Sequence, residues 1–281
     1  FLTNSIILKD SIIKIEYHMK LVLFASIFCV LSTIQQSNAQ SKYALLLVGH
    51  QEDGTTSAIH EMNKIADLFQ ANGIGVYKFY DYNANWEEVK RVASECSFLV
   101  YSGHGSNLGI QGQVGGLIIN PSVSTEKLMS ELRLKNNSLI LFKSVCYGAG
   151  STAGDDEDIQ VEEAKRRVTE YAYPFFEIGA AAYYANNYQN GVYNFLTDFF
   201  KGKTIKDAFV NSASTWTDIE FDVPFNRYTN KNISIASSAG GGMATRITYT
   251  NGVKKVETVP SPKSYSIAYV GDPNFSINDQ R

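Results

Sequence analysis

Ser138-Leu-Ile-Leu-Phe-Lys-Ser-Val-Cys146 and Phe98-Leu-Val-Tyr-Ser-Gly-His104 are two short apolar runs, and each ends in a reactive side chain. Continuous apolar runs of this length that are rich in strand formers are typical of buried parallel strands. The carboxyl ends of such strands line the crevice in which open α/β sheets bind and transform ligands. The two runs therefore predict a cysteine nucleophile, Cys146, beside an imidazole base, His104.

The rest of the chain alternates strand and helix patterns. We expect strands at 43–49, 76–80, 97–102, 138–145 and 180–185, and helices at 57–72, 85–94, 124–132, 159–178, 192–200 and 205–213. Pro174 should break or kink its helix, and the glycine-rich segment 109–116 should form a hairpin beside the site. The alternation predicts an α/β fold, a three-layer αβα sandwich whose central sheet is mostly parallel and covered on both faces.

The order of the histidines narrows the choice of enzyme class. His18, His50, His60 and His104 all precede Cys146. Papain-like enzymes and α/β-hydrolases carry their histidine after the nucleophile, so both are excluded if the base is a histidine. A zinc hydrolase using His50, His104 and Cys146 is also disfavoured, because no motif with ligand spacing is present.

The two motifs together resemble those of the caspase-like clan of cysteine peptidases. Tyr101-Ser-Gly-His-Gly-Ser106 is similar to the histidine motif of metacaspases. Ile267-Ala-Tyr-Val-Gly-Asp-Pro273 resembles the closing strand of gingipain-type domains, and clostripain is a further relative of this kind. The resemblance implies a caspase-like fold and a cysteine endopeptidase that hydrolyses peptide bonds through a His-Cys dyad and a thioacyl-enzyme intermediate.

The resemblance also implies roles for individual residues. In the related peptidases the oxyanion hole is formed by the backbone amides of the glycine after the histidine and of the cysteine, here Gly105 and Cys146. The residue two before the cysteine lines the substrate pocket, and an acid there accompanies basic specificity. Here that residue is the uncharged Ser144. His50 is a second candidate for the pocket, and an equally good candidate for a structural histidine. No third carboxylate is identifiable.

An acidic stretch, Asp155-Asp156-Glu157-Asp158, follows the nucleophile closely. Related enzymes use this region to bind calcium, to hold a basic substrate or as a loop that is cut during activation. A solvated loop explains it equally well, because negative charge stabilises the amino end of the helix that follows. The predicted chemistry requires no cofactor, and calcium is the one candidate.

The first 39 residues predict a leader that the mature protein lacks. Met19-Lys20 precedes an apolar run, and Ser37 and Ala39 stand where a signal peptidase expects small residues, so we expect cleavage before Gln40 and secretion to the cell exterior or the periplasm. The run is shorter than the roughly 20 residues of a membrane helix, so stable membrane insertion of the mature chain is not expected. Residues 40–281 should form one peptidase domain.

Charge and cysteine content restrict the partners further. The expected mature chain has 22 basic and 26 acidic residues, which argues against a nucleic-acid partner and leaves a peptide or protein substrate. Cys96 and Cys146 should lie at opposite ends of parallel strands, so both are expected to be free. Two alternatives stay open: a catalytically silent caspase-like scaffold, and a transpeptidase on the same fold.

Overall fold

The computed structural model describes residues 42–155, 158–213, 218–224, 231–238, 243–250, 253–260 and 263–280. All of them belong to one unit, Lys42–Arg281. The predicted leader and the cleavage before Gln40 lie outside the described residues, as do Asp156 and Glu157. No helix in the described part of the chain is long and apolar enough to cross a membrane.

Eight strands form one mixed sheet in the order β2-β1-β3-β4-β5-β10-β7-β6. The five strands from β2 to β5 are parallel, with bounds β1 (Tyr43–Val48), β2 (Gly75–Tyr80), β3 (Cys96–Ser102), β4 (Ser138–Lys143) and β5 (Ala180–Asn186). β10 (Ser264–Gly271) runs antiparallel to β5 and to β7 (Asn232–Ser238), and β6 (Asp218–Pro224) runs antiparallel to β7. A separate antiparallel pair is formed by β8 (Met243–Thr250) and β9 (Val253–Pro260).

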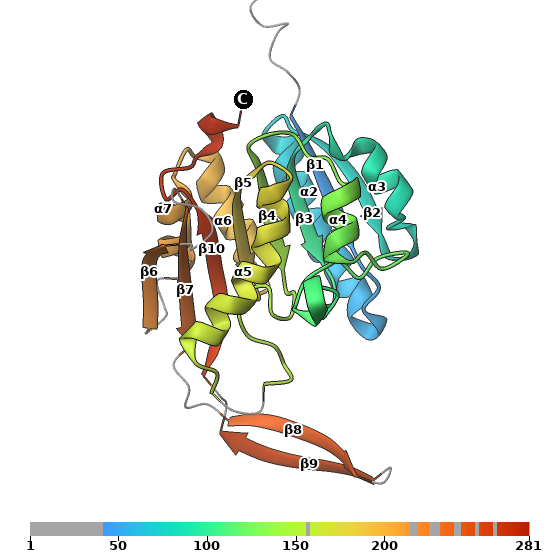
Figure 1. Cartoon of the computed structure of the whole chain (residues 1–281), viewed down its shortest axis with the longest axis vertical. Coiled ribbons are helices and arrows are strands. Elements are labelled where there is room, and N and C mark those ends of the chain that lie inside the picture. The colour runs from blue at the N-terminus through green and yellow to red at the C-terminus, as the bar shows by residue number, and fades with distance from the viewer. Residues whose placement is uncertain are drawn as a thin grey trace, which may run out of the picture. The chain divides into compact units, whose positions relative to one another are not determined.

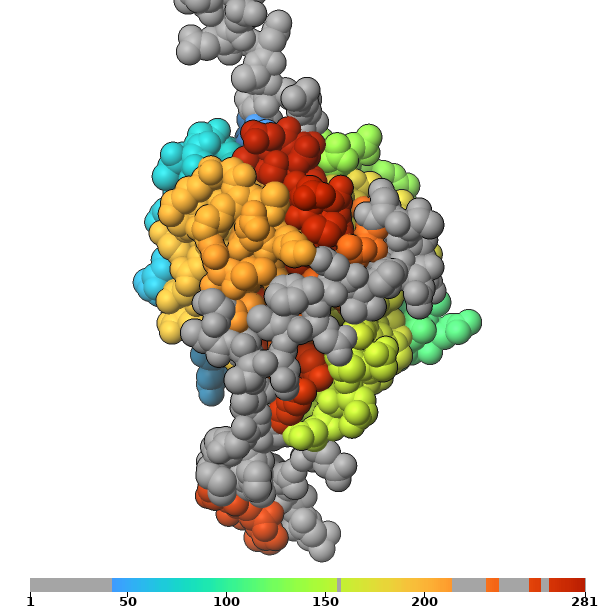
Figure 2. Space-filling model, turned by 90° about the vertical axis from the view of Figure 1, so that its left-hand side faces the viewer, coloured from blue at the N-terminus to red at the C-terminus, as the bar shows by residue number. Residues whose placement is uncertain are grey.

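Helices cover both faces of the main sheet (Figure 1). One face carries α2 (Thr55–Ala71), α6 (Gly191–Phe200) and α7 (Ile205–Ala213), and the other carries α3 (Trp86–Ala93), α4 (Thr125–Glu131) and α5 (Val161–Glu177). Figure 2 views the molecule from the side of α6 and α7, drawn in amber. Short 3-10 helices are η1 (Glu52–Gly54), η2 (Asp81–Asn83), η3 (Ile110–Gly112) and η4 (Ile277–Asp279).

The side chains of each central strand alternate between these two helical layers. In β4, Leu139 and Leu141 join the core under α2, α6 and α7, whereas Ile140 and Phe142 join the core under α3, α4 and α5. Successive side chains of a strand point to opposite faces, so a strand that is apolar at every position can bury both. The predicted three-layer αβα sandwich is confirmed.

Pro174 does not break its helix, and one further local prediction is wrong. α5 continues through Pro174 to Glu177, because the proline lies in the last turn, costs one hydrogen bond there and is buried with its neighbours Tyr171 and Phe175. The segment 109–116 is not a hairpin but a compact loop around η3, closed by Gly109 N donating to Gln113 O at 2.9 Å. A positive φ at Gln111, of 57°, turns the chain within a few residues, so no ladder forms.

Candidate active site

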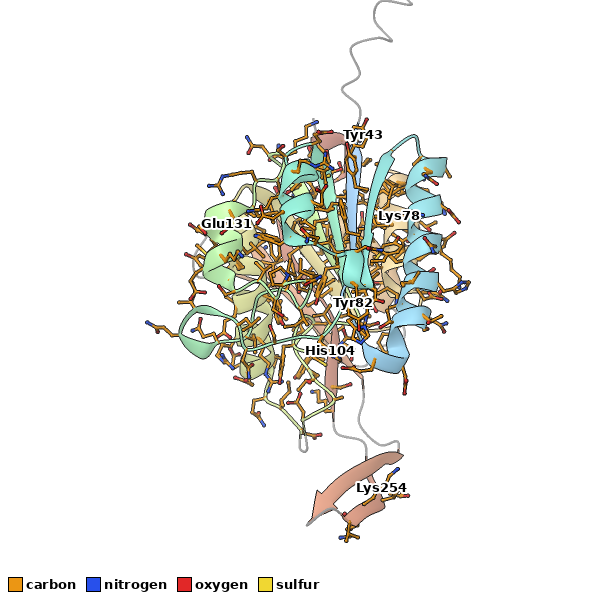
Figure 3. The ribbon with its side chains drawn as sticks, turned by 90° about the vertical axis from the view of Figure 1, so that its right-hand side faces the viewer. Tyr43, Lys78, Tyr82, His104, Glu131 and Lys254 are labelled. Atoms are coloured by element: carbon orange, nitrogen blue, oxygen red, sulfur yellow. The ribbon has the colours of Figure 1, made fainter. Side chains whose placement is uncertain are left out.

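The two motif residues leave neighbouring strands at the same edge of the sheet. β3 and β4 are parallel, with Tyr101 opposite Phe142. His104 follows the end of β3 by two residues, and Cys146 follows the end of β4 by three. Figure 3 shows His104 at the end of the sheet opposite Tyr43, the first residue of β1. The carboxyl edge of the sheet therefore carries both residues, as the sequence predicted.

The backbones of the two motifs are in direct contact. A Cβ atom added to Gly105 would lie 2.0 Å from the carbonyl oxygen and 2.8 Å from the Cβ of Cys146. Only glycine fits between the histidine and the cysteine loop at this distance. The Tyr101 hydroxyl fixes the histidine loop further, since it donates to the His104 carbonyl at 3.1 Å and accepts from Ile118 N at 3.1 Å.

Two backbone amides at this contact have no acceptor. Within the described residues, the N–H groups of Gly105 and Cys146 make no hydrogen bond, whereas the next amide in each loop is satisfied. Ser106 N donates to the Tyr171 hydroxyl at 2.7 Å, and Tyr147 N donates to Ser151 O at 2.9 Å. Unpaired amides beside a nucleophile can stabilise the negative oxygen that forms during acyl transfer.

A carboxylate that the sequence analysis missed contacts the histidine. Glu52 Oε2 lies 3.1 Å from His104 Nε2. An ionised carboxylate can only accept, so this bond places the hydrogen on Nε2 and leaves the Nδ1 lone pair able to take a proton. Glu52 follows β1, the neighbour of β3, by four residues. The position of Glu52 just after a strand was the one feature of the sequence that could have pointed to it, and Asp53 has the same feature.

Backbone strain collects at the same edge. Four of the six non-glycine residues with positive φ in the described part of the chain follow β1, β2 or β4: Glu52, Asp81, Ser144 and Tyr147, with φ of 43°, 56°, 55° and 67°. Such conformations cost free energy and persist where the surrounding structure holds them, often at functional sites. Ser144 is held by its N–H, which donates to Asn186 O at 3.1 Å.

The other two histidines of the described chain have separate surroundings. His50 Nδ1 lies 2.8 Å from Asp81 Oδ1, and its ring stacks on Tyr82 with 4.9 Å between ring centroids. Tyr82 lies towards the same end of the sheet as His104 (Figure 3), yet His50 does not line the pocket beside Cys146. His60 is exposed on α2. Neither takes part in the contact between Gly105 and Cys146.

A pocket of about 320 Å³ opens beside the cysteine. Cys146 and the predicted pocket residue Ser144 both line it. The remaining lining residues are small or polar: Ser151, Thr152, Ala153, Asn187, Ser264 and Ser266. None of these described residues carries a charge, so the pocket offers hydroxyl and carboxamide groups rather than an ion-pair partner.

At least one residue of the acidic stretch is anchored to α5 by an ion pair. Asp155 accepts from Arg167 Nη1 at 2.9 Å and from Thr152 N at 2.9 Å, and both side chains of the ion pair are almost fully buried. Asp158 accepts from Lys263 N. Among the described residues no cluster of three or more histidine, cysteine, aspartate or glutamate side chains could hold a metal ion. Asp156 and Glu157 lie outside the residues that can be assessed.

The second cysteine of the domain is remote from the site. Cys96 begins β3, at the opposite edge of the sheet from Cys146, and both thiols are free. Cys96 is buried, and its Sγ lies 3.3 Å from Val92 O. Burial raises the pKa of the Cys96 thiol to about 12. The predicted placement of the two cysteines at opposite ends of the parallel strands is confirmed.

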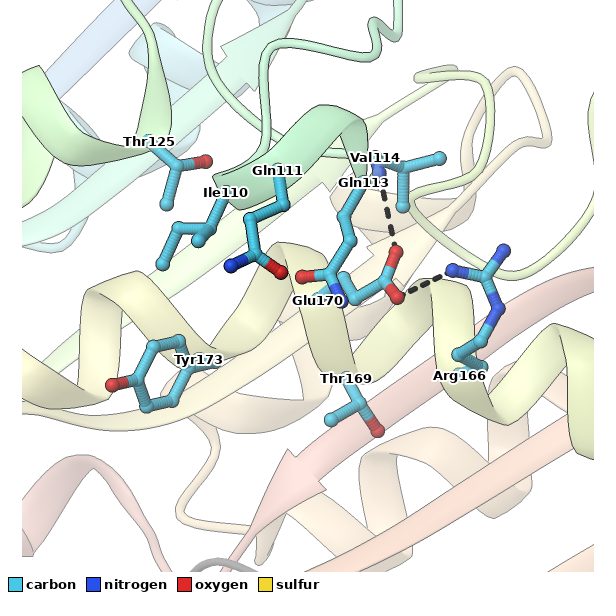
Figure 4. Close-up of a pocket in the computed structure, with 9 residues that line it drawn as sticks. All are labelled: Ile110, Gln111, Gln113, Val114, Thr125, Arg166, Thr169, Glu170 and Tyr173. Atoms are coloured by element: carbon cyan, nitrogen blue, oxygen red, sulfur yellow. Dashed lines mark hydrogen bonds and ion pairs between the residues drawn. The ribbon is translucent and has the colours of Figure 1, made fainter.

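A second cavity, of about 370 Å³, lies between the 109–116 loop and α5 (Figure 4). Glu170 on α5 accepts from Val114 N at 3.1 Å and pairs with Arg166. The hydrogen bond from Val114 N to Glu170 ties the loop to the helix. Neither His104 nor Cys146 lines this cavity, so it is separate from the candidate active site.

No family model matches this chain, and a search of curated proteins likewise finds no match.

Proposed function

We propose that this protein is a cysteine endopeptidase that hydrolyses peptide bonds through His104 and Cys146. The observation that carries the proposal is the contact between the two loops, where the unpaired amides of Gly105 and Cys146 flank a half-buried thiol. A nucleophile, a base and donors for an oxyanion are the three components that acyl transfer needs.

The reaction proceeds in two halves. His104 takes the thiol proton, and the Cys146 sulfur attacks the peptide carbonyl to form a tetrahedral intermediate whose oxygen accepts from the amides of Gly105 and Cys146. The imidazolium then gives its proton to the leaving amine, the C–N bond breaks, and a thioester remains. Water, deprotonated by His104, attacks the thioester and releases the carboxylic acid, and the proton returns to the sulfur.

Glu52 serves this chemistry as a positioning residue. Its contact at Nε2 fixes the ring orientation and tautomer of His104, as the third member of a catalytic triad does. Both side chains are largely exposed, with 73% of the Glu52 surface and 49% of the His104 surface accessible, so their contact adds little to the stability of the fold. The contribution of Glu52 is to hold the His104 ring in the orientation that proton transfer needs.

The proposed setting follows from the leader. Cleavage before Gln40 would deliver residues 40–281 to the cell exterior or the periplasm, where peptide or protein substrates would be met. The proposed reaction uses no cofactor, since base, nucleophile and oxyanion donors all come from the chain.

The test is chemical labelling combined with a peptide-hydrolysis assay. Iodoacetamide or an epoxide probe at pH 8 should modify Cys146 and leave Cys96 unmodified, because the raised pKa of Cys96 keeps its thiol protonated. Cys146→Ala should abolish hydrolysis, His104→Ala should lower turnover by about 10³-fold or more, and the control Cys96→Ala should retain most activity. Equal losses in Cys146→Ala and Cys96→Ala would contradict the proposal.

A further inference from the structure

The pocket beside Cys146 lies where the side chain next to the scissile bond must go. It is walled by the loop after β4 with Ser144 and Cys146, by residues 151–153, by Asn187 after β5 and by β10. Because Cys146 lines the pocket, a substrate whose carbonyl reaches its sulfur can place the side chain of the same residue in this space. That residue is called P1 below.

The walls of this pocket are held in place by hydrogen bonds between its segments. Ser151 N donates to Tyr265 O at 3.0 Å, and Tyr265 N donates to Ser151 Oγ at 2.7 Å. Asn187 N donates to Ser266 O at 2.9 Å, which ties the loop after β5 to β10. A pocket fixed before substrate arrives loses little entropy on binding, so its polar groups can select among side chains.

The chemistry of the walls is polar and uncharged. Six of the eight lining residues bear a hydroxyl or a carboxamide. One acceptor, Asn187 Oδ1, is buried and has no hydrogen-bond partner within the described part of the chain. A buried acceptor without a donor costs free energy. A substrate side chain that donates a hydrogen bond to this oxygen is therefore favoured.

The charges around the pocket do not favour a cationic side chain. The Asp155 carboxylate already accepts hydrogen bonds from Arg167 and from Thr152 N, and Asp158 accepts from Lys263 N. Behind the wall, the buried ammonium of Lys143 lies 3.4 Å from Ser144 Oγ. Glu61 on α2 attracts this ammonium but also pairs with Lys64 at 2.8 Å, so these three groups together carry a net positive charge. Among the described residues that line this pocket, none offers a carboxylate to arginine or lysine.

We infer that this pocket selects a P1 residue with an uncharged, hydrogen-bonding side chain, either a carboxamide (Asn or Gln) or a hydroxyl (Ser or Thr). The inference rests on the proposed function and names its substrate class. A cation would lose water and gain no ion pair from the described walls, and an aliphatic side chain would leave the buried acceptor Asn187 Oδ1 unpaired. A site built to hydrogen-bond its substrate discriminates strongly against analogues that cannot do so.

The test measures kcat/KM on a peptide set that varies only at P1. We expect Asn, Gln, Ser and Thr to exceed Arg, Lys and Leu by about 10-fold or more. Ser144→Asp supplies the missing carboxylate, and its positive φ suits aspartate better than most residues. This variant should raise the Arg-to-Asn ratio by about 10-fold or more. The matched control is Ser130→Asp at an exposed position of α4, which should leave the ratio unchanged.

A binding measurement separates this inference from the proposed chemistry. In the inactive Cys146→Ala protein, a peptide with Asn at P1 should bind about 10-fold more tightly than its Arg counterpart. A wild-type preference for Arg, Lys, Asp, Glu or Leu, with Cys146 labelled normally, would overturn the inference alone. Absence of both hydrolysis and Cys146 labelling would overturn the proposed function and the inference together.

Discussion

The close approach of Gly105 to Cys146 allows a sharp test by the substitution Gly105→Ala. The new Cβ atom would lie 2.0 Å from the Cys146 carbonyl oxygen, 2.7 Å from the carbonyl carbon and 2.8 Å from the Cys146 Cβ. Cβ contacts below 3.0 Å are essentially never found in proteins. All three clashing atoms belong to the cysteine loop, so no flexible side chain can move aside. The two loops must separate by about 1 Å.

The magnitude follows from the role of the amides. A displacement of about 1 Å in a catalytic group can cost about 10²-fold in rate. Loss of one oxyanion donor costs about 10²–10³-fold, or about 2.7–4 kcal/mol of transition-state stabilisation. We therefore expect kcat of Gly105→Ala to fall by about 10²–10³-fold. The matched control is Gly154→Ala, whose Cβ would meet, among the described residues, only Thr152 Cγ2, at 3.9 Å, and which should keep kcat within about twofold.

Two assays distinguish a damaged oxyanion site from a damaged nucleophile. Turnover of a fluorogenic peptide reports the whole reaction, whereas alkylation of Cys146 by iodoacetamide needs the thiolate but no oxyanion hole. Gly105→Ala should keep its circular-dichroism spectrum and alkylate within about 10-fold of wild type while turnover falls much further. A folded variant that retains kcat within about threefold would refute the proposed role of the contact.

Two further predictions concern carboxylates near the site. Glu52→Gln should lower kcat by about 10–10²-fold in the peptide assay. This loss is smaller than for a buried triad carboxylate, because Glu52 is exposed. The adjacent control, Asp53→Asn, should keep kcat within about twofold of wild type in the same assay. Hydrogen bonds and charges from Arg166 and Arg167 lower the pKa of Glu163 from 4.5 to about 2. This carboxylate therefore stabilises the fold above pH 4.5, and the contribution is lost as the pH falls towards 2. In Glu163→Gln, the loss of unfolding free energy between pH 4.5 and pH 2 should be smaller than in wild type by about 1 kcal/mol, after allowance for solvent screening. Urea unfolding at each pH measures this difference. An unchanged pH–stability curve would contradict the assignment.

The sequence was most informative where local pattern and burial agree. β3 and β4 are apolar at successive positions because both of their faces are buried, and this produces the continuous runs by which they were predicted. The expected helix starts at 85 and 124 are confirmed by side-chain caps. Asn85 Oδ1 accepts from Glu87 N at 2.9 Å, and Ser124 Oγ accepts from Lys127 N at 3.3 Å.

Prediction failed where a segment depends on distant parts of the chain. The strands β6, β7, β8 and β9 were not expected, although β6 alternates acidic and apolar residues in the way that is typical of a half-buried strand. Their pairing is defined by partner strands elsewhere in the chain. The 109–116 loop was mistaken for a hairpin because glycine content alone does not distinguish a two-stranded turn from a loop anchored to a helix. Its anchor, the bond from Val114 N to Glu170 at 3.1 Å, joins residues 56 positions apart.

The candidate site likewise combines residues that a local pattern predicts with residues that only the whole fold brings together. His104 and Cys146 were found because each terminates its own strand, which is a local property. Glu52 reaches His104 only because β1 is the neighbour of β3 in the sheet, and the strand order is a property of the whole fold. The pocket beside Cys146 depends on this order even more strongly, since β10 supplies Ser264 and Ser266 from more than a hundred residues further along the chain. The reaction type can therefore be proposed from two short motifs, whereas specificity becomes accessible only when β10 is placed beside β5.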